Sequence, residues 1–177
     1  MNTPALSYSK GAIWLHWIIA AMMITMLFLG EDMIRHATAS FYPSLHASLG
    51  ISILVLSLVR IWWRLSHPVP ALPATMKNWE QKISYATHFT FYLLMIGLPL
   101  SGLMSFSTES AKEVAVAGAT LFGVLPVPAL PNIGGIGGNV HGLGAKIGQV
   151  LVILHILAAL KHQFWDKDNL LKRMSPH

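Results

Sequence analysis

The stretch HGLGAKIGQVLVILHILAALKHQFW, residues 141–165, decides the fold class of this chain. A helix that crosses the ~30 Å hydrocarbon core of a bilayer needs about 20 mostly apolar residues, and this stretch is long enough. Three histidines interrupt it, His141, His155 and His162, at separations of fourteen and then seven residues. Ionisable residues inside a membrane are costly and usually functional, so the histidines need a chemical explanation.

Three further stretches, residues 11–30, 44–63 and 83–106, are also apolar enough to span a bilayer. Apolar residues make up 54% of the 177-residue chain and charged residues only 11%, whereas soluble domains are about 25% charged. We therefore predict an all-α membrane protein, a four-transmembrane-helix bundle that forms a single domain over residues 1–177. Pro99 is predicted to kink the third helix or to end it early.

The charged residues predict that both termini are cytoplasmic, because basic residues accumulate on that side of a membrane. The side that holds the termini carries Lys10, Arg60, Arg64, Lys77, Lys82, Lys161, Lys167, Lys172 and Arg173 against Glu80, Asp166 and Asp168. The other side carries Arg35, Lys112 and Lys146 against Glu31, Asp32, Glu109 and Glu113. The net charge of +5 is thus interpreted as an orientation signal, and no nucleic acid is expected as a partner.

Three segments lie outside the four spans. A long periplasmic loop joins the third and fourth helices, and we expect its apolar part, residues 114–131, to hold a short interfacial helix. The sequence NIGGIGGN, residues 132–139, is interpreted as a flexible hinge before the fourth helix. Residues 166–177 are expected to form an amphipathic tail on the lipid headgroups.

The spacing of the histidines places two of them on one face of the fourth helix. Fourteen residues correspond to a rise of ~21 Å, and the rotation returns to within about 40° of its start. His141 and His155 therefore share a face but lie near opposite leaflets. On the first two helices, His16 lies at the depth of His155, and His46 lies at the depth of His141. This arrangement predicts two separate imidazole pairs, and Gly148 leaves room between them.

Non-covalent haem is the ligand that best suits two such pairs. The chain has no cysteine, which excludes iron–sulfur clusters, thiolate zinc sites and covalently attached haem. Zinc prefers four ligands, and no carboxylate lies at these depths. Gly30 and Gly50 add clearance for a large flat group. The alternative, in which each histidine only forms a hydrogen bond to a neighbouring helix, does not account for the matched depths.

Two other histidines are open to more than one interpretation. His88 on the third helix is either a rival ligand on the cytoplasmic side or a packing residue at the edge of a quinone site. His162 lies beside Lys161 and Trp165 near the interface. It is either a residue that extends towards the headgroups or a proton-handling group at a quinone.

Three motifs resemble the prokaryotic cytochrome b561 family over nearly the whole chain. They are WLHW at residues 14–17, LHASLGISILVLSLVRIWWR at residues 45–64 and LHILAALKHQFWDKDNLLKRM at residues 154–174. The resemblance implies a four-helix bundle with two haems b, and the implied axial ligands are His16, His46, His141 and His155. It also implies a quinone near the cytoplasmic helix ends around His162, with Lys161, Trp165 and His88 as further candidates. Arg60, fourteen residues after His46, is then either a partner of a haem propionate or an anchor on the positively charged side.

The resulting hypothesis is a cytochrome of the bacterial inner membrane that transfers electrons between ubiquinone and a periplasmic donor or acceptor. Superoxide is one candidate donor, because one type of family member oxidises it, and a small redox protein is another. A haem-containing anchor subunit of a larger respiratory oxidoreductase is an alternative, so enzymatic activity of the chain itself stays open. A histidine-based proton or metal transporter is disfavoured, because none of the four spans contains an acidic residue.

Overall fold

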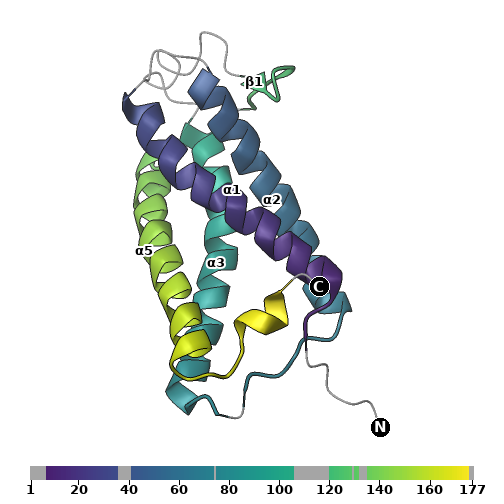
Figure 1. Ribbon diagram of the computed structural model, residues 1–177. Helices are drawn as coiled ribbons and strands as arrows, with labels where there is room; N and C mark the ends of the chain where they lie inside the picture. The colour runs from purple at the N-terminus through teal and green to yellow at the C-terminus, as the bar shows by residue number, and fades with distance from the viewer. Residues whose placement is uncertain are drawn as a thin grey trace.

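Four long helices dominate the computed structural model, which describes residues 7–35, 41–73, 75–105, 120–128, 130–131 and 135–175, without the side chains of residues 33–35. Each helix is long and apolar enough to cross a membrane. They are α1 (Lys10–Arg35), α2 (Phe41–Ser66), α3 (Asn78–Ser105) and α5 (Gly137–Phe164) (Figure 1). The prediction of an all-α membrane protein with four spans is confirmed.

The helices extend beyond the apolar runs that predicted them, because hydrogen bonding continues where the side chains become polar. The first turn of α3 shows the reason. The carboxylate of Glu80 accepts a hydrogen bond from the backbone N–H of Lys77 at 2.9 Å, which is half of a capping box. This contact starts the helix at Asn78, five residues before the predicted boundary.

Pro99 does not end α3, which continues to Ser105. Proline lacks a backbone N–H and so removes one hydrogen bond of the helix. In the turns that follow, hydroxyl groups add hydrogen bonds to the backbone. Ser101 donates to the carbonyl of Leu98 at 3.0 Å, and Ser105 donates to the carbonyl of Gly102 at 2.6 Å. Of the two alternatives predicted at Pro99, the early end was therefore wrong, and the kink stays a prediction.

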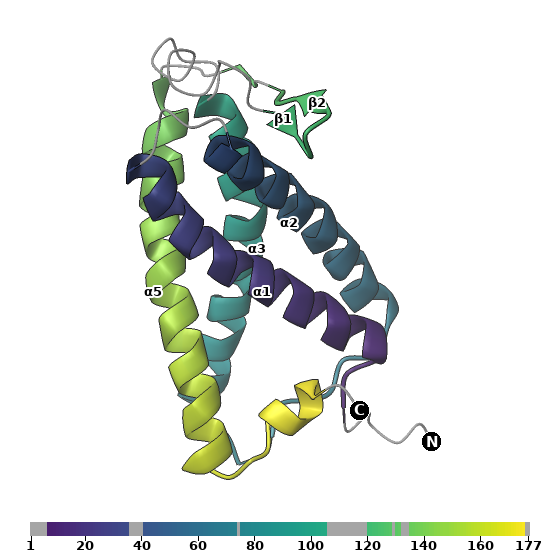
Figure 2. The ribbon, with the colours of Figure 1, turned by 45° about the horizontal axis from the view of Figure 1, so that its top comes forward.

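The helices pack as two pairs, α1 along α2 and α3 along α5, which are joined mainly by α2 against α3. α1 crosses the bundle diagonally (Figures 1 and 2). The core between the pairs is small and is centred on Ile19, Ile53 and Met95. Many large apolar side chains point outward instead, among them Trp62 and Phe89, which are more than half exposed. This distribution suits a surface that faces lipid.

Part of the long loop forms a β-hairpin, where we expected an interfacial helix. Strands β1 (Thr120–Leu121) and β2 (Leu125–Pro126) pair antiparallel. Phe122 and Gly123 have φ values of 53° and 74°, which suit a turn and not a helix. The hairpin is held on α2, where Ser48 Oγ accepts a hydrogen bond from the N–H of Phe122 at 2.9 Å. Residues 114–119 and 129 of the expected helix lie outside the described residues.

The expected hinge before the fourth helix is described only in part. Residues 132–134 lie outside the described residues, and Gly135 has a φ of 70°. α5 begins at Gly137, within the glycine-rich stretch and four residues before the predicted start.

The C-terminal tail turns back from α5 towards the start of α1. After Phe164 the chain turns and then forms a short 3-10 helix, η2 (Leu171–Met174). The indole N–H of Trp17 donates to the carbonyl of Met174 at 2.7 Å, and Arg173 Nη1 donates to the carbonyl of Ala71 at 2.6 Å. Over its described part, the tail expected on the headgroups therefore contacts the protein. We call this end of the bundle the tail end and the opposite end, which carries β1 and β2, the hairpin end (Figure 2).

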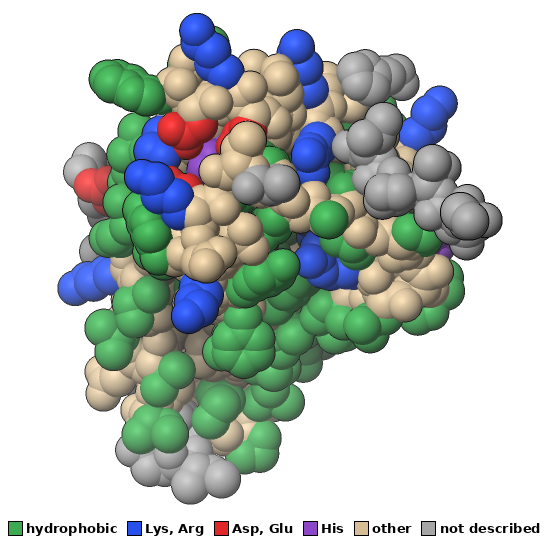
Figure 3. All heavy atoms as spheres, turned by 90° about the horizontal axis from the view of Figure 1, so that it is seen from below, with side chains coloured by type: hydrophobic (Ala, Val, Ile, Leu, Met, Phe, Trp, Pro, Cys, Tyr) green, Lys and Arg blue, Asp and Glu red, His purple; other side chains and the backbone are tan. Residues whose placement is uncertain are grey.

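Basic residues gather at the tail end. The basic residues assigned to one side of the membrane by the sequence lie in the first turn of α1, the second half of α2, the beginning of α3, the end of α5 and the tail. Figure 3 shows Lys and Arg side chains across this face, with acidic side chains beside some of them. The first and last described residues, 7 and 175, and most of the basic charge are therefore at the same end of the bundle.

Candidate functional site

At the hairpin end, α2 and α5 bring His46 and His141 together. The centroids of the two rings are 5.8 Å apart, and their planes are inclined by 64°. The two residues are far apart in the sequence, and they meet because each lies one to two turns from the hairpin-end terminus of its helix. This is the pair that the matched depths predicted.

A backbone carbonyl fixes the orientation of the His141 ring. Nδ1 of His141 lies 2.8 Å from the carbonyl oxygen of Leu98 on α3. A carbonyl only accepts hydrogen bonds, so Nδ1 carries the hydrogen and Nε2 keeps its lone pair. Histidines that bind metals usually hold their other ring nitrogen in such a bond. Nε2 is thereby the ring nitrogen of His141 that could hold a metal ion.

Gly102 makes room for this ring. A Cβ atom at position 102 would lie 3.1 Å from Cε1 and 3.2 Å from Nδ1 of His141, which is too close for an ordinary contact. Any other residue at position 102 would therefore require the ring to shift by a few tenths of an ångström. Neither Gly102 nor the Leu98 carbonyl was identified from the sequence, because only the packing of α3 against α5 brings them to His141.

Nδ1 of His46 is buried and has no hydrogen-bond partner in the described part of the chain. A buried nitrogen without a partner costs roughly 1–3 kcal/mol. Neutral imidazole binds metals through either ring nitrogen, so coordination can remove this cost.

Towards the tail end, three histidines from three helices meet. The ring of His155 on α5 lies 6.4 Å from the ring of His16 on α1 and 5.8 Å from that of His88 on α3, measured between centroids. Phe91 contacts the same ring at 5.3 Å. The structure thus brings His16 to His155 as predicted, and it also makes His88 a geometric rival.

The separations within these groups fit one metal ion held between two imidazoles. A metal–imidazole nitrogen bond is about 2 Å long, so two rings on opposite sides of one ion have centroids roughly 6 Å apart. His141 and His155 are fourteen residues, or ~21 Å, apart along one helix, so they belong to separate sites. The donor sets contain only imidazoles, which suits the iron of a non-covalent haem.

The glycines expected to give clearance differ in their surroundings. An added Cβ at Gly30 would meet nothing within 4 Å, and one at Gly50 would meet only the Met26 methyl group at 3.9 Å. At Gly148, a methyl group of Leu94 lies 3.8 Å from the same point. The space beside Gly30 is open, and an added Cβ at Gly50 or Gly148 would make one ordinary contact.

Arg60 lies at the tail end, where it joins α2 to α1. Its Nη1 donates to the carbonyl of Ala12 at 3.0 Å, one turn before His16. Arg60 and Arg64 both line a pocket, together with Tyr8, Trp63 and other residues. Two guanidinium groups in one pocket favour an anionic ligand.

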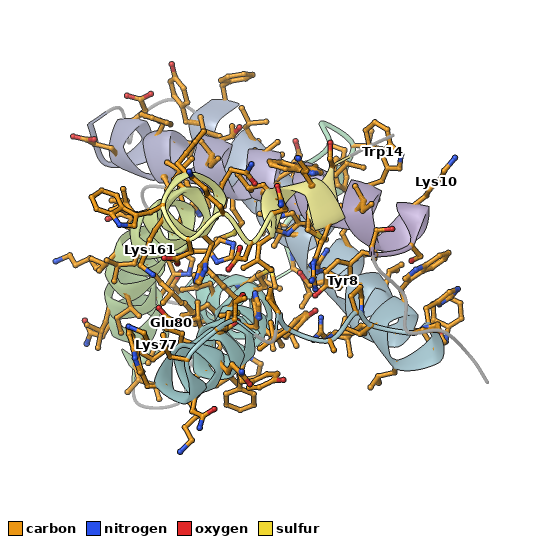
Figure 4. All side chains as sticks on the ribbon, turned by 60° about the horizontal axis from the view of Figure 1, so that its bottom comes forward. Tyr8, Lys10, Trp14, Lys77, Glu80 and Lys161 are labelled. Atoms are coloured by element: carbon orange, nitrogen blue, oxygen red, sulfur yellow. The ribbon has the colours of Figure 1, made fainter. Side chains whose placement is uncertain are left out.

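His162 lies in a cluster of charged residues that connects α3, α5 and the tail. The residue is 8% exposed. Its Nδ1 is 2.7 Å from Asp168 Oδ2 and 3.0 Å from Asp166 Oδ2. Lys161 Nζ bridges Asp166 at 2.6 Å and Glu80 at 3.0 Å, and Figure 4 shows Lys161 beside Glu80. His162 is therefore buried among carboxylates and does not extend towards the headgroups.

The three other residues proposed for the quinone site, Lys161, His88 and Trp165, have different surroundings. Lys161 belongs to the His162 cluster, whereas His88 contacts His155. Trp165 is 85% exposed. The sequence did not single out Asp166 and Asp168, although the order Asp-Lys-Asp directly after an apolar helix is a signal for carboxylates that return to the helix end.

Four spanning helices around facing imidazole pairs define a membrane cytochrome as the class of protein. The chain belongs to the prokaryotic cytochrome b561 family, whose model matches residues 7–177. Membership of this family indicates electron transfer in the membrane through haem b.

Several relatives match the chain over nearly its whole length. It is 33% identical to cytochrome b561 homolog 2 of Escherichia coli, over 98% of this chain and 93% of the relative. It is 29% identical to a probable superoxide oxidase, CybB, of Yersinia pestis, over 96% of both chains. It is also 29% identical to cytochrome b562 of Cereibacter sphaeroides, over 94% of both chains.

Proposed function

We propose that the chain holds two haems b, one between His46 and His141 and one between His16 and His155, and transfers electrons across the membrane between them. The observation that carries this proposal is the geometry of the two pairs. Their centroids are 5.8 and 6.4 Å apart, and both pairs share helix α5. A haem with two imidazole ligands has no open position for oxygen, so its chemistry is the transfer of single electrons.

The protein side chains have distinct roles in this proposal. The Leu98 carbonyl and Gly102 orient His141. Arg60 and Arg64 supply positive charge for the propionate groups at the tail end. If Arg60 were only an anchor on the positively charged side, it would not need to line the same pocket as Arg64. His88 is proposed to pack against His155 and to border the quinone site.

The tail end is proposed to face the cytoplasm, in the inner membrane of a bacterium. The support is the basic excess at this end, which follows the rule that basic residues accumulate in cytoplasmic loops. The hairpin end then faces the periplasm.

Ubiquinone is proposed as the substrate at the tail end, near His162, Lys161 and Trp165. Reduction of a quinone consumes protons as well as electrons, so its site needs a group that exchanges protons. His162 is buried but borders the carboxylate of Asp166, whose side chain is 30% exposed, which provides such a group next to a proton source.

The periplasmic partner is proposed to be either superoxide or a small redox protein. One relative is a probable superoxide oxidase. However, the residues that the sequence assigns to this side comprise three basic against four acidic ones, and such a balance does not steer an anion over a distance. Glu109, Lys112 and Glu113 of this set lie outside the described residues.

A second candidate function is that of a haem-containing anchor subunit for a larger oxidoreductase. It is favoured by the apolar tip of the hairpin, where Phe122 and Val124 are 63% and 78% exposed. A partner protein docked at this end would cover that tip.

Spectroscopy of the purified chain tests the main proposal. The reduced-minus-oxidised spectrum and the haem content should show two b-type haems for each chain. Quinone reduction should depend on His162 and should be much weaker in His162→Gln. A folded but colourless preparation would exclude the haem sites, and wild-type activity of His162→Gln would exclude the quinone site.

A further inference from the structure

The chain directly after α5 folds back so that Asp168 contacts His162 twice. Asp168 Oδ2 lies 2.7 Å from Nδ1 of the ring. The backbone N–H of Asp168 donates to the carbonyl oxygen of His162 at 3.2 Å. The side chain of Asp168 is only 3% exposed. A carboxylate held at two points and shielded from water has a fixed position relative to the imidazole.

The turn that brings Asp168 to His162 contains left-handed backbone on both sides of Asp168. Lys167 and Asn169, the residues on either side, have φ values of 57° and 59°. This left-handed region costs a residue such as Lys167 roughly 1–2 kcal/mol, whereas asparagine adopts it more readily. Such conformations persist where the surrounding contacts determine them, often at functional sites. The turn therefore indicates that the position of Asp168 matters.

The contact determines which nitrogen of His162 carries the hydrogen. An ionised carboxylate only accepts hydrogen bonds, so Nδ1 is the donor and Nε2 has the lone pair when the ring is neutral. In the described part of the chain, Nε2 has no hydrogen-bond partner. Nε2 is thus the atom that can exchange a proton with a bound molecule.

Asp166 is not equivalent to Asp168. Its Oδ2 lies 3.0 Å from the same nitrogen but also 2.6 Å from Lys161 Nζ. Its side chain is 30% exposed, whereas that of Asp168 is 3% exposed. Asp166 is therefore shared with the lysine and with water. Asp168 contacts His162 through Oδ2 and accepts a hydrogen bond from the backbone N–H of Leu170 through Oδ1 at 3.4 Å.

We propose that Asp168 is a positioning residue that fixes the tautomer and the ring orientation of His162, so that Nε2 exchanges a proton with a quinone oxygen. This rests on the quinone site proposed above. Reduction of one quinone to the hydroquinone takes two electrons, supplied by the proposed haems, and two protons. One proton leaves Nε2 of the imidazolium as an O–H bond forms, and the neutral ring keeps its hydrogen on Nδ1. The second proton, and the one that restores the imidazolium, come from water.

The test uses the full haem-loaded chain in lipid nanodiscs with 15N-labelled histidine. The signals of His162 are identified by their loss in His162→Gln. In the wild type they should report one neutral tautomer with the hydrogen on Nδ1, and in Asp168→Ala a mixture of tautomers. Asp168→Ala should lower kcat for quinone reduction by about 10- to 100-fold and change KM much less. Asp32→Ala, which removes a carboxylate near the hairpin end, should change neither.

The outcomes separate the two proposals. Wild-type quinone reduction by His162→Gln would exclude the quinone site, and the tautomer measurement would still decide the role of Asp168. An unchanged tautomer and an unchanged kcat in Asp168→Ala would overturn the positioning role, as would a change in Asp166→Ala alone. If Asp168→Ala loses its haems, Lys167→Gly provides the second variant. It relieves the turn and should keep the wild-type tautomer, and loss of that tautomer would contradict the proposal.

Discussion

The histidine groups at the two ends of the bundle differ in how many rings compete for one position. At the hairpin end His141 faces His46, and the Leu98 carbonyl holds its ring. At the tail end His155 faces both His16 and His88. The distances between rings thus indicate one partner for His141 among the described residues, whereas they leave two partners open for His155.

The largest expected effect comes from removing the rings of the hairpin-end pair. His46→Ala and His141→Ala should each abolish binding of the same haem, because one imidazole does not replace the pair. Haem content and the low-temperature reduced spectrum measure this, with loss of the same spectral component in both variants. Loss of different components would break the proposed pairing.

A comparison of His16→Ala with His88→Ala decides which of the two histidines pairs with His155 at the tail end. His16→Ala should lose the tail-end haem, whereas His88→Ala should keep it and only shift its spectrum, because its packing against His155 changes. Electron paramagnetic resonance of the oxidised protein distinguishes the two results. Loss of haem in His88→Ala with retention in His16→Ala would reassign the ligand.

A smaller effect is expected for Gly102→Ala at the hairpin end. The new methyl group would lie 3.1 Å from the His141 ring, and overpacking of this kind costs about 1–3 kcal/mol. The hairpin-end haem should dissociate more readily, as measured by haem transfer to an acceptor protein. Gly97→Ala is the matched control, because nothing lies within 4 Å of a Cβ there.

The smallest effect is expected for Ser48→Ala, which leaves the N–H of Phe122 without its partner on α2. The loss of about 1 kcal/mol should appear as faster hydrogen exchange in residues 120–126, with unchanged haem content. Ser52→Ala, which removes only a hydrogen bond within α2, should leave the hairpin protected. Equal exchange in both variants would show that Ser48 does not hold the hairpin.

The sequence predicted the features that depend on position along one helix. Apolar length identified the four spans, and a rise of 1.5 Å per residue placed His141 and His155 at opposite depths. It did not predict the contacts between distant segments. The approach of His88 to His155, and of the Leu98 carbonyl to His141, depends on how α3 is rotated against α5, which apolar length does not determine.

The turns were the other part that the sequence did not predict. The apolar loop was expected to hold a short interfacial helix, yet in its described part hydrogen bonds to serines on α2 hold a hairpin. The turn around Asp168 uses left-handed backbone at a lysine and an asparagine. Residue type alone does not favour that conformation at Lys167.

The bond between His141 and the Leu98 carbonyl has a consequence for how this chain tolerates variation. Because the acceptor is a backbone atom, no side-chain replacement at position 98 removes it, and other apolar residues are expected to serve there. Position 102 has the opposite character, because a side chain there would require the ring to shift by a few tenths of an ångström. The orientation of one histidine thus depends on a backbone atom at one position and on the size of the side chain at another.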